Sequence, residues 1–207
     1  TTNLVVTAVY ERSEDTYMVN VVNGKLSNGQ TTGYYKFDYP VTVTADSPPE
    51  GQKFSHWMQD GQKISYDSTF EFFTPMTDTN VEAIYVDDSV VVNKIPFITL
   101  SNNTIVDSAN QTIAFTATRE LTTDYTLIES GVLMLKSSVA PESEITVSTE
   151  NVILGKISND STDQFYIRKT NVGLGDTWYA RGYLMYEDVN GNIITVYSDL
   201  TVNATMN

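Results

Sequence analysis

The 207-residue sequence predicts an all-β or β-dominant protein. Many short segments alternate apolar and polar residues, which is the periodicity of a strand with one buried face. Glycine, proline, asparagine and aspartate cluster between these segments, as they do in tight turns. No window of ten or more residues shows a convincing helical period. The chain is therefore expected to fold as short strands packed into sheets.

The stretch 40–85 shows the clearest alternation and holds the only histidine and one of the two tryptophans. Residues 41–45 (Val-Thr-Val-Thr-Ala) and 69–73 (Thr-Phe-Glu-Phe-Phe) are typical of strands. Phe54 and Trp57 lie between Pro-Pro-Glu-Gly and Asp-Gly, both of which are turn signals. We expect these two aromatic side chains to be structural anchors in the core of a first module.

A strand is also expected over residues 17–22, and it ends at Asn23-Gly24. This dipeptide is typical of the two-residue turn of a β-hairpin. The sequence therefore predicts a hairpin at this point.

The chain contains a partial internal repeat. Val-Thr-Ala-Val-Tyr at residues 6–10 matches Val-Glu-Ala-Ile-Tyr at residues 81–85, and such periodicity is how tandem arrays are recognised in sequence. We therefore interpret residues 1–13 as the last strand of a preceding repeat and residues 14–88 as one β module.

The character of the sequence changes near residues 88–95, where we place the boundary to a second unit, residues 96–207. The continuous apolar run at residues 131–135 is typical of a central strand that is buried on both faces. About seven short strands with regularly spaced turns predict a β-sandwich. The expected strands are residues 112–117, 131–135, 145–147, 152–154, 165–167, 178–186 and 193–197.

Composition excludes several classes of function. The formal net charge of −14 repels phosphate backbones and anionic lipids, so we expect no nucleic-acid partner and no direct membrane binding. The chain has no cysteine, which excludes disulfides and thiol chemistry. No apolar run reaches the roughly 20 residues of a membrane-spanning helix. The first residues have neither an initiator methionine nor the pattern of a signal peptide, so we interpret the chain as a fragment of a longer protein.

The sequence offers little for catalysis. His56 is the only imidazole, and neighbouring strand positions do not bring Ser55 and Asp60 together with it as a triad requires. One histidine and no thiol exclude the usual zinc ligand sets. Gly173-x-Gly175 lacks the third glycine and the following helix of a dinucleotide-binding motif. We therefore predict no enzyme activity, no catalytic residues, no cofactor and no metal.

One acidic loop has two interpretations. Residues 187–192 (Glu-Asp-Val-Asn-Gly-Asn) carry oxygen ligands at a spacing similar to that of a calcium loop. The loop lacks the full alternation of ligands and the final bidentate glutamate. A type I′ hairpin turn explains Asn190-Gly191 without a cation, so we expect a turn at Asp188 rather than a calcium site.

Thirteen tyrosines raise the question of a ligand site. Exposed aromatic rings can stack on sugar faces, although most tyrosines of a β protein line its cores or form cross-strand pairs. Tyr34, Tyr35 and Tyr39 cluster beside a glycine-containing loop. They are the ligand-binding candidates of this sequence.

The motif Gly51-x-x-Phe54-x-x-Trp57, with the strands on either side of it, resembles the divergent internalin-type B-repeat of Gram-positive surface proteins. The resemblance covers about residues 14–86 and includes the Val-Thr-Val-Thr-Ala strand and the ending Met76 to Tyr85. It implies a β-grasp-like module that occurs in tandem. The family pattern has a glycine before the Val-Thr-Val-Thr-Ala strand, where this chain has Phe-Asp-Tyr-Pro.

The second half is similar to bacterial fibronectin type III or immunoglobulin-like modules. The resemblance is carried by Glu-Ser-Gly-Val-Leu at residues 129–133, by residues 174–183 (Leu-Gly-Asp-Thr-Trp-Tyr-Ala-Arg-Gly-Tyr) and by the closing Tyr-Ser-Asp. In such modules a tyrosine clamps the corner of the sandwich through its hydroxyl. The resemblance puts Trp178 at that place as a structural anchor, with Tyr179 as the alternative.

Together these resemblances imply non-catalytic spacer or interaction modules of a bacterial cell-surface or secreted protein. They also imply an extracellular location on the surface or wall of a Gram-positive bacterium, with neighbouring repeats of the same chain as partners. Two alternatives stay open: an adhesin that binds host protein or glycan, and accessory domains of a large surface hydrolase.

Overall fold

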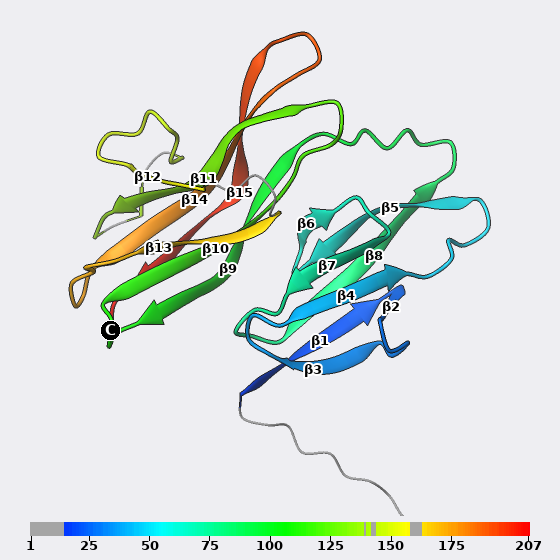
Figure 1. Ribbon diagram of the computed structural model, residues 1–207, viewed down its shortest axis with the longest axis horizontal. Helices are drawn as coiled ribbons and strands as arrows, with labels where there is room; N and C mark the ends of the chain where they lie inside the picture. Colours follow the sequence, from blue (N-terminus) through cyan, green and yellow to red (C-terminus); the bar gives the residue numbers. More distant parts are fainter. Residues whose placement is uncertain (1–14, 139, 142–143, 158–162) are drawn as a thin grey trace, which may run out of the picture.

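The computed structural model describes residues 15–138, 140–141, 144–157 and 163–207. These residues form fifteen strands and contain no helix, which confirms the all-β prediction. Two groups of sheets lie side by side, joined by a connector that runs from β8 to β9 (Figure 1). The predicted repeat strand at residues 1–13 lies outside the described residues.

Eight strands form the N-terminal module, the name used here for residues 16–87. They are β1 (Thr16–Val22), β2 (Gly24–Leu26), β3 (Thr32–Lys36), β4 (Pro40–Ala45), β5 (Gln52–Gln59), β6 (Gln62–Ser65), β7 (Thr69–Phe73) and β8 (Thr79–Asp87). One sheet has the order β3-β1-β8-β5-β6, and a smaller sheet has the order β2-β4-β7. The first and last strands, β1 and β8, are parallel neighbours inside the larger sheet, and its other pairs are antiparallel.

The core of the N-terminal module lies between these two sheets. Alternation places Val41 and Val43 of β4 on the inner face, as the sequence predicts, and Val81 and Ala83 of β8 meet them from the larger sheet. Trp57 is fully buried in this cluster. The alternating pattern therefore predicted the buried face of β4.

Seven strands form the C-terminal sandwich, the name used here for residues 97–205. They are β9 (Phe97–Asp107), β10 (Thr112–Glu120), β11 (Thr126–Lys136), β12 (Ile153–Lys156), β13 (Gln164–Lys169), β14 (Thr177–Glu187) and β15 (Ile193–Thr205). Their sheets have the orders β13-β10-β9 and β12-β11-β14-β15. A separate apolar core with Leu100, Phe115 and Leu184 fully buried fills the space between them, as expected for a β-sandwich.

The predicted hairpin at Asn23-Gly24 and the predicted strand at residues 145–147 are not formed. Asn23-Gly24 does not close a hairpin, because β1 pairs with β3 and β8 while β2 pairs with β4, so the chain passes from one sheet to the other at this dipeptide. Residues 145–147 form no strand, and Ile145 is instead a buried loop residue packed with Leu133 and Tyr183.

The longest missed element is β9. Its alternation is interrupted where residues 101–103 (Ser-Asn-Asn) face the single residue Thr116 of β10. Such a bulge breaks the period of two on which strand prediction depends. The strand was therefore not recognisable from its pattern.

Candidate functional site

The three tyrosines predicted as a ligand site do not share one surface. Tyr34 is 54% exposed, and strand alternation turns Tyr35 to the other face of β3, where it packs against the core. Tyr35 stacks on Tyr39, with ring centroids 5.6 Å apart, and burial followed by the neighbouring Tyr39 raises the pKa of Tyr35. The structure thus pairs Tyr35 with Tyr39 and separates Tyr34 from them.

The turn before β4, residues 37–39, contains no glycine. Asp38 has φ of 60°, a left-handed conformation that aspartate adopts more readily than most residues. Its amide donates to the carbonyl of Thr74 (2.9 Å), and the amide of Thr74 donates to the carbonyl of Tyr39 (3.0 Å). The chain therefore makes this turn without glycine, and the bonds tie residues 37–39 to residues 73–75.

The predicted anchors of the N-terminal module lie in its core. The Trp57 ring is 6.0 Å from the Phe54 ring and 5.8 Å from the Phe70 ring, measured between centroids, and Phe54 is half-buried at the edge of the cluster. The indole Nε1 of Trp57 lies 3.4 Å from the carbonyl oxygen of Ser68. The hydroxyl of Tyr85 donates to the carbonyl of Asp46 (2.7 Å), which links the last strand to the opposite sheet.

Trp178 is a buried anchor but not a clamp. Its side chain is 6% exposed within the sandwich core, and its Nε1 has no hydrogen-bond partner in the described part of the chain. The bonded tyrosine of β14 is Tyr183, which donates its hydroxyl to Glu129 at 2.8 Å. Burial and then this bond raise the pKa of Tyr183. On β14 the hydroxyl contact is therefore made by Tyr183, and not by Trp178 or Tyr179, the two predicted positions.

The loop after β14 is a hairpin closed by Asp188. Its Oδ1 accepts from the amides of Asn190 (2.8 Å) and Asn192 (2.9 Å), and its Oδ2 accepts from the Asn192 side chain (3.0 Å). These bonds lower the pKa of Asp188. The predicted turn type was wrong, because only Gly191 has positive φ here, at 80°, whereas type I′ requires two such residues. No group of three or more histidine, aspartate and glutamate side chains among the described residues is arranged to hold a metal ion.

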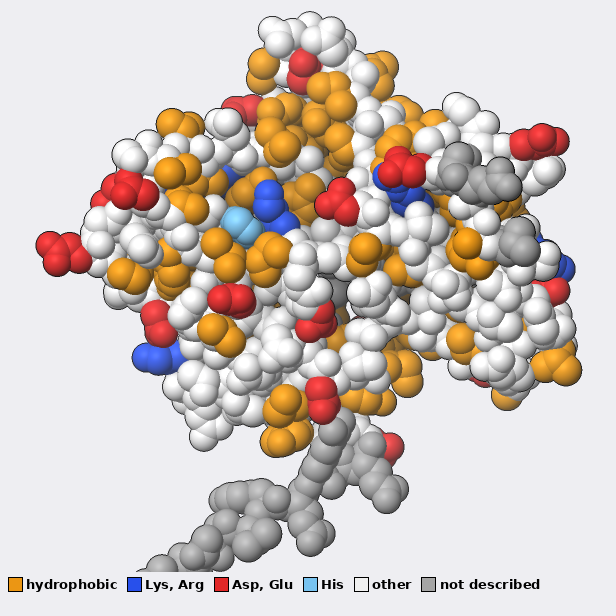
Figure 2. All heavy atoms as spheres, turned by 180° about the vertical axis from the view of Figure 1, so that it is seen from behind, with side chains coloured by type: hydrophobic (Ala, Val, Ile, Leu, Met, Phe, Trp, Pro, Cys, Tyr) orange, Lys and Arg blue, Asp and Glu red, His pale blue; other side chains and the backbone are white. Residues whose placement is uncertain are grey.

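His56 lies on β5 and is half-buried. Its ring meets the Tyr66 ring edge to face at 6.5 Å, and its Nδ1 lies 2.9 Å from the Ser55 hydroxyl. Burial and then the charge of Lys63 lower its pKa. On the back of the molecule the histidine sits among basic and hydrophobic side chains (Figure 2).

The two halves of the chain meet at the open edges of the N-terminal sheets. β6 ends the five-stranded sheet and β7 ends the three-stranded sheet, and both lie toward the sandwich. The amide of Tyr66, directly after β6, donates to the Glu120 carboxylate at 2.7 Å. The amide of Phe73 on β7 donates to Gln164 Oε1, also at 2.7 Å. Side chains of the sandwich thus satisfy amides of both strand edges.

Tyr66 is the centre of this junction. Its ring packs edge to face on Phe97, with centroids 5.6 Å apart, and its hydroxyl accepts from Lys63 at 2.9 Å. Lys94 of the connector lies over the same ring at 5.9 Å. A further bond joins Gln62 Nε2 to the carbonyl of Leu100 (3.0 Å). Tyr66 is only 3% exposed, so its side chain is buried where the two halves meet.

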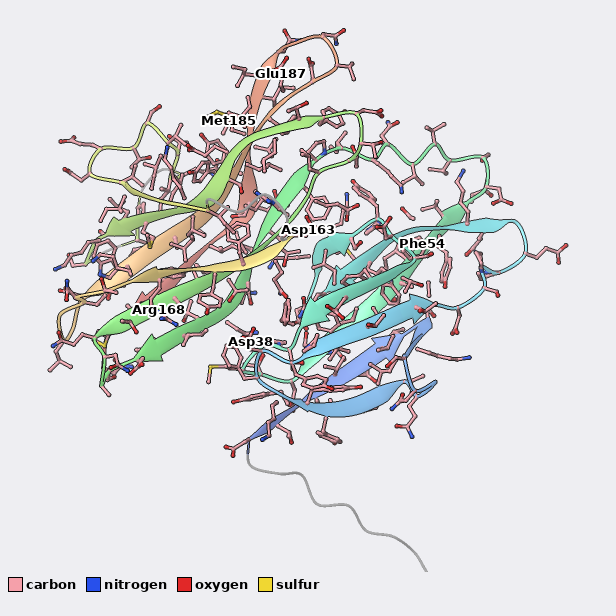
Figure 3. All side chains as sticks on the ribbon, in the orientation of Figure 1. Asp38, Phe54, Asp163, Arg168, Met185 and Glu187 are labelled. Atoms are coloured by element: carbon pink, nitrogen blue, oxygen red, sulfur yellow. The ribbon has the colours of Figure 1, made fainter. Side chains whose placement is uncertain are left out.

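Acidic side chains border this contact. Burial is the main cause that raises the pKa of Glu120, and the bond from Tyr66 opposes it. Burial also raises the pKa of Asp163, and the charge of Arg119 opposes this rise. The negative charge of Asp67 raises the pKa of both Glu120 and Asp163. Asp163 and Asp38 lie where the halves meet, and Phe54 lies away from this contact (Figure 3). The junction therefore contains carboxyl groups that hold their protons more tightly than exposed ones.

A groove of about 580 Å³ runs along the junction. It is lined from both halves, by the turn around Asp38, by Phe73 and Met76, and by Asn102 and Tyr166 of the sandwich. Sequence reasoning named none of these as site residues.

Tyr66 was also missed by sequence reasoning. Its partner Glu120 lies 54 residues away, and no local pattern indicates this contact.

The described residues contain no helix long and apolar enough to cross a membrane. A comparison with curated proteins gives no match to this chain, and a comparison with solved structures gives none. A family model, described as the divergent InlB B-repeat domain, does match part of the chain. Over residues 16–89, close to the range in which the sequence motifs lie, the chain is similar to that domain, which confirms the B-repeat resemblance.

Proposed function

We propose that the chain consists of non-catalytic spacer and interaction modules of a bacterial cell-surface or secreted protein, displayed outside the cell on a Gram-positive wall. The B-repeat match supports a surface-type repeat module. Neighbouring repeats of the same longer protein would be its partners, and the charge of −14 argues against nucleic acid. No residue is given a catalytic role in this proposal.

The proposal includes a division at the connector, with residues 14–88 and 96–207 as separate modules. The apolar clusters support it, since one draws its buried residues from 19–83, and the other two draw theirs from 98–206 and 133–183. The strand order of the second module supports a fibronectin type III or immunoglobulin-like sandwich. Its first, second and fifth strands share one sheet, and its third, fourth, sixth and seventh share the other. In immunoglobulin-like folds the third, sixth and seventh strands share a sheet, and some of these folds add a strand beside the third, where β12 lies here.

The single observation that carries a spacer role is the bonded junction. A spacer keeps the next domain at a fixed distance only if consecutive modules do not swing freely. Contacts between domains of one chain are often small, and relative motion is the default expectation. Here Glu120 and Gln164 accept hydrogen bonds from strand amides of the other half, and the Tyr66 ring is buried between the halves. These contacts support a fixed orientation of the two modules.

Residual dipolar couplings of the backbone amides test this orientation. One alignment tensor should fit both halves of the whole chain in solution. In the double variant Glu120→Ala with Gln164→Ala, two different tensors are expected because both junction acceptors are lost. Glu82→Ala is the control, since it removes an exposed glutamate of β8 away from the junction. Two independent tensors for the unaltered protein would contradict a rigid spacer.

A further inference from the structure

The junction groove exposes large apolar side chains along its length. Phe37, Phe73, Met76 and Tyr166 line it and are 39%, 39%, 43% and 48% exposed. The guanidinium of Arg168, a residue that does not line the groove, lies 5.6 Å from the Tyr166 ring centroid, within the range of a cation–π contact. Apolar side chains gathered in one hollow mark binding surfaces more often than single exposed ones do. The groove volume of about 580 Å³ also lies within the range of ligand sites.

Neutral hydrogen-bonding groups alternate with these apolar surfaces. The bulge of β9 turns Asn102 and Asn103 to the groove, where a regular strand would place residues on both faces in turn. The Oε1 of Gln164 accepts a hydrogen bond from the Phe73 amide, which holds the side chain in place. Its Nε2 can therefore donate a hydrogen bond to a ligand. Amides in fixed positions beside exposed rings are suited to ligands that are hydroxylated and partly apolar.

The charge of the groove narrows the choice of ligand. Among the described residues no lysine or arginine lines it, and its two charged residues are Asp38 and Asp60. Asp60 is occupied, because its two carboxylate oxygens accept from the Thr79 hydroxyl (2.8 Å) and the Asn80 amide (3.1 Å). With a net charge of −14 on the chain, anions are repelled, and the one remaining aspartate is a weak trap for a cationic ligand.

Strand addition by an extended peptide is also disfavoured. Such a peptide pairs with free amides of an exposed strand edge. The edge amide of Phe73 on β7 is already bonded to Gln164.

We propose that this groove binds a neutral oligosaccharide. The rings of Phe73 and Tyr166 stack on the C–H faces of the sugars, and the amides of Asn102, Asn103 and Gln164 bond to hydroxyl groups. Residues of both modules contribute, so the site exists only in the joined pair.

Calorimetric titration of the whole chain tests the proposal, with neutral tetrasaccharides of β-1,4-glucose, β-1,4-N-acetylglucosamine, β-1,4-mannose and α-1,4-glucose as probes. At least one should bind, and a sulfated tetrasaccharide should not. Tyr166→Ala should weaken binding about tenfold, which corresponds to about 1.4 kcal/mol. Asn102→Ala, an exposed amide in the bulge, should weaken it without a change in the melting temperature.

Tyr34→Ala is the matched control, because Tyr34 is a tyrosine of similar exposure that does not line the groove. It should bind as the unaltered chain does. Loss of binding in Tyr34→Ala but not in Tyr166→Ala would overturn the groove as the site. Absence of binding by every neutral probe at millimolar concentration would overturn the proposal itself. The sugar site needs the joined pair and therefore rests on the junction of the proposed spacer. If the sugar site alone fails, one alignment tensor still fits both halves, and this distinguishes its failure from failure of the spacer role.

Discussion

Gly24 lies directly against Trp57: a Cβ built on Gly24 would come within 2.5 Å of Cη2 of the indole and 2.7 Å of the Thr44 carbonyl oxygen. Such distances do not occur between real side chains, so the small residue is required by the large one. The chain passes between the two sheets of the N-terminal module at this point.

Gly24→Ala should therefore destabilise the N-terminal module by about 1–3 kcal/mol, the usual cost of overpacking a dense core. Urea unfolding followed by tryptophan fluorescence measures the change. Glu82→Ala, an exposed position of β8, is the control and should stay within about 0.5 kcal/mol of the unaltered chain. Unchanged unfolding of Gly24→Ala would show that the backbone shifts freely at β2.

Trp57→Ala should cost about 3–5 kcal/mol and unfold the N-terminal module, because it empties the centre of the core. Phe73→Ala removes an aromatic residue of the same region that is 39% exposed, so its cost should be far smaller. Thermal melting by circular dichroism compares the two variants. A Trp57→Ala chain that melts as the unaltered one does would contradict the role of Trp57 as the anchor.

Asp38→Gly should stabilise the protein by about 0.5–1 kcal/mol, because glycine adopts the positive φ of this turn without the steric cost that a Cβ carries. Asp38→Ala should be destabilising at the same position. A strained turn is supported if the unfolding free energy is highest for glycine, intermediate for aspartate and lowest for alanine at position 38. If alanine were as stable as glycine, the conformation of residue 38 would not limit stability.

Glu120→Gln tests the electrostatics of the junction. Glutamine can still accept from the Tyr66 amide, but it carries no charge to desolvate beside Asp67. Since the pKa of Glu120 is raised in the folded chain, that chain binds the proton more tightly than the unfolded one. Its stability relative to Glu120→Gln should therefore increase as the pH falls from 7 through the raised pKa.

Urea unfolding of both proteins at several pH values between 7 and 4 gives this difference directly. Glu120→Ala, which loses the acceptor as well, should be less stable than Glu120→Gln by about 1–2 kcal/mol at each pH. A difference between the unaltered chain and Glu120→Gln that does not vary with pH would mean that Glu120 is effectively solvated.

The sequence was most informative where one face of a strand is buried. Alternation predicted β4 and β7, and the position of Trp57 between two turn signals predicted its place in the core. It was least informative where a local rule yields to a distant contact. Asn23-Gly24 is typical of a hairpin turn, yet here Gly24 packs on Trp57 and the chain crosses to the other sheet. Apolar residues at 145 and 147 predicted a strand, but Ile145 belongs to a loop whose apolar side chain packs into the core.

The junction and its groove could not be predicted for the same physical reason. Tyr66 and Glu120 each lie in segments with no distinctive composition, and their bond depends on how two separately built cores dock. The three tyrosines chosen from their proximity in sequence were divided by strand alternation, which sends Tyr34 and Tyr35 to opposite faces. Residues that line the groove come from several separate segments of the chain.

The covered edges of β6 and β7 also bear on where this polypeptide can be cut. A shorter chain that ends in the connector would leave the amides of Tyr66 and Phe73 without Glu120 and Gln164. Unpaired strand edges of this kind recruit strands from other molecules. The N-terminal module released by proteolysis at residues 88–96 would thus be prone to self-association, whereas the uncut pair would stay dispersed.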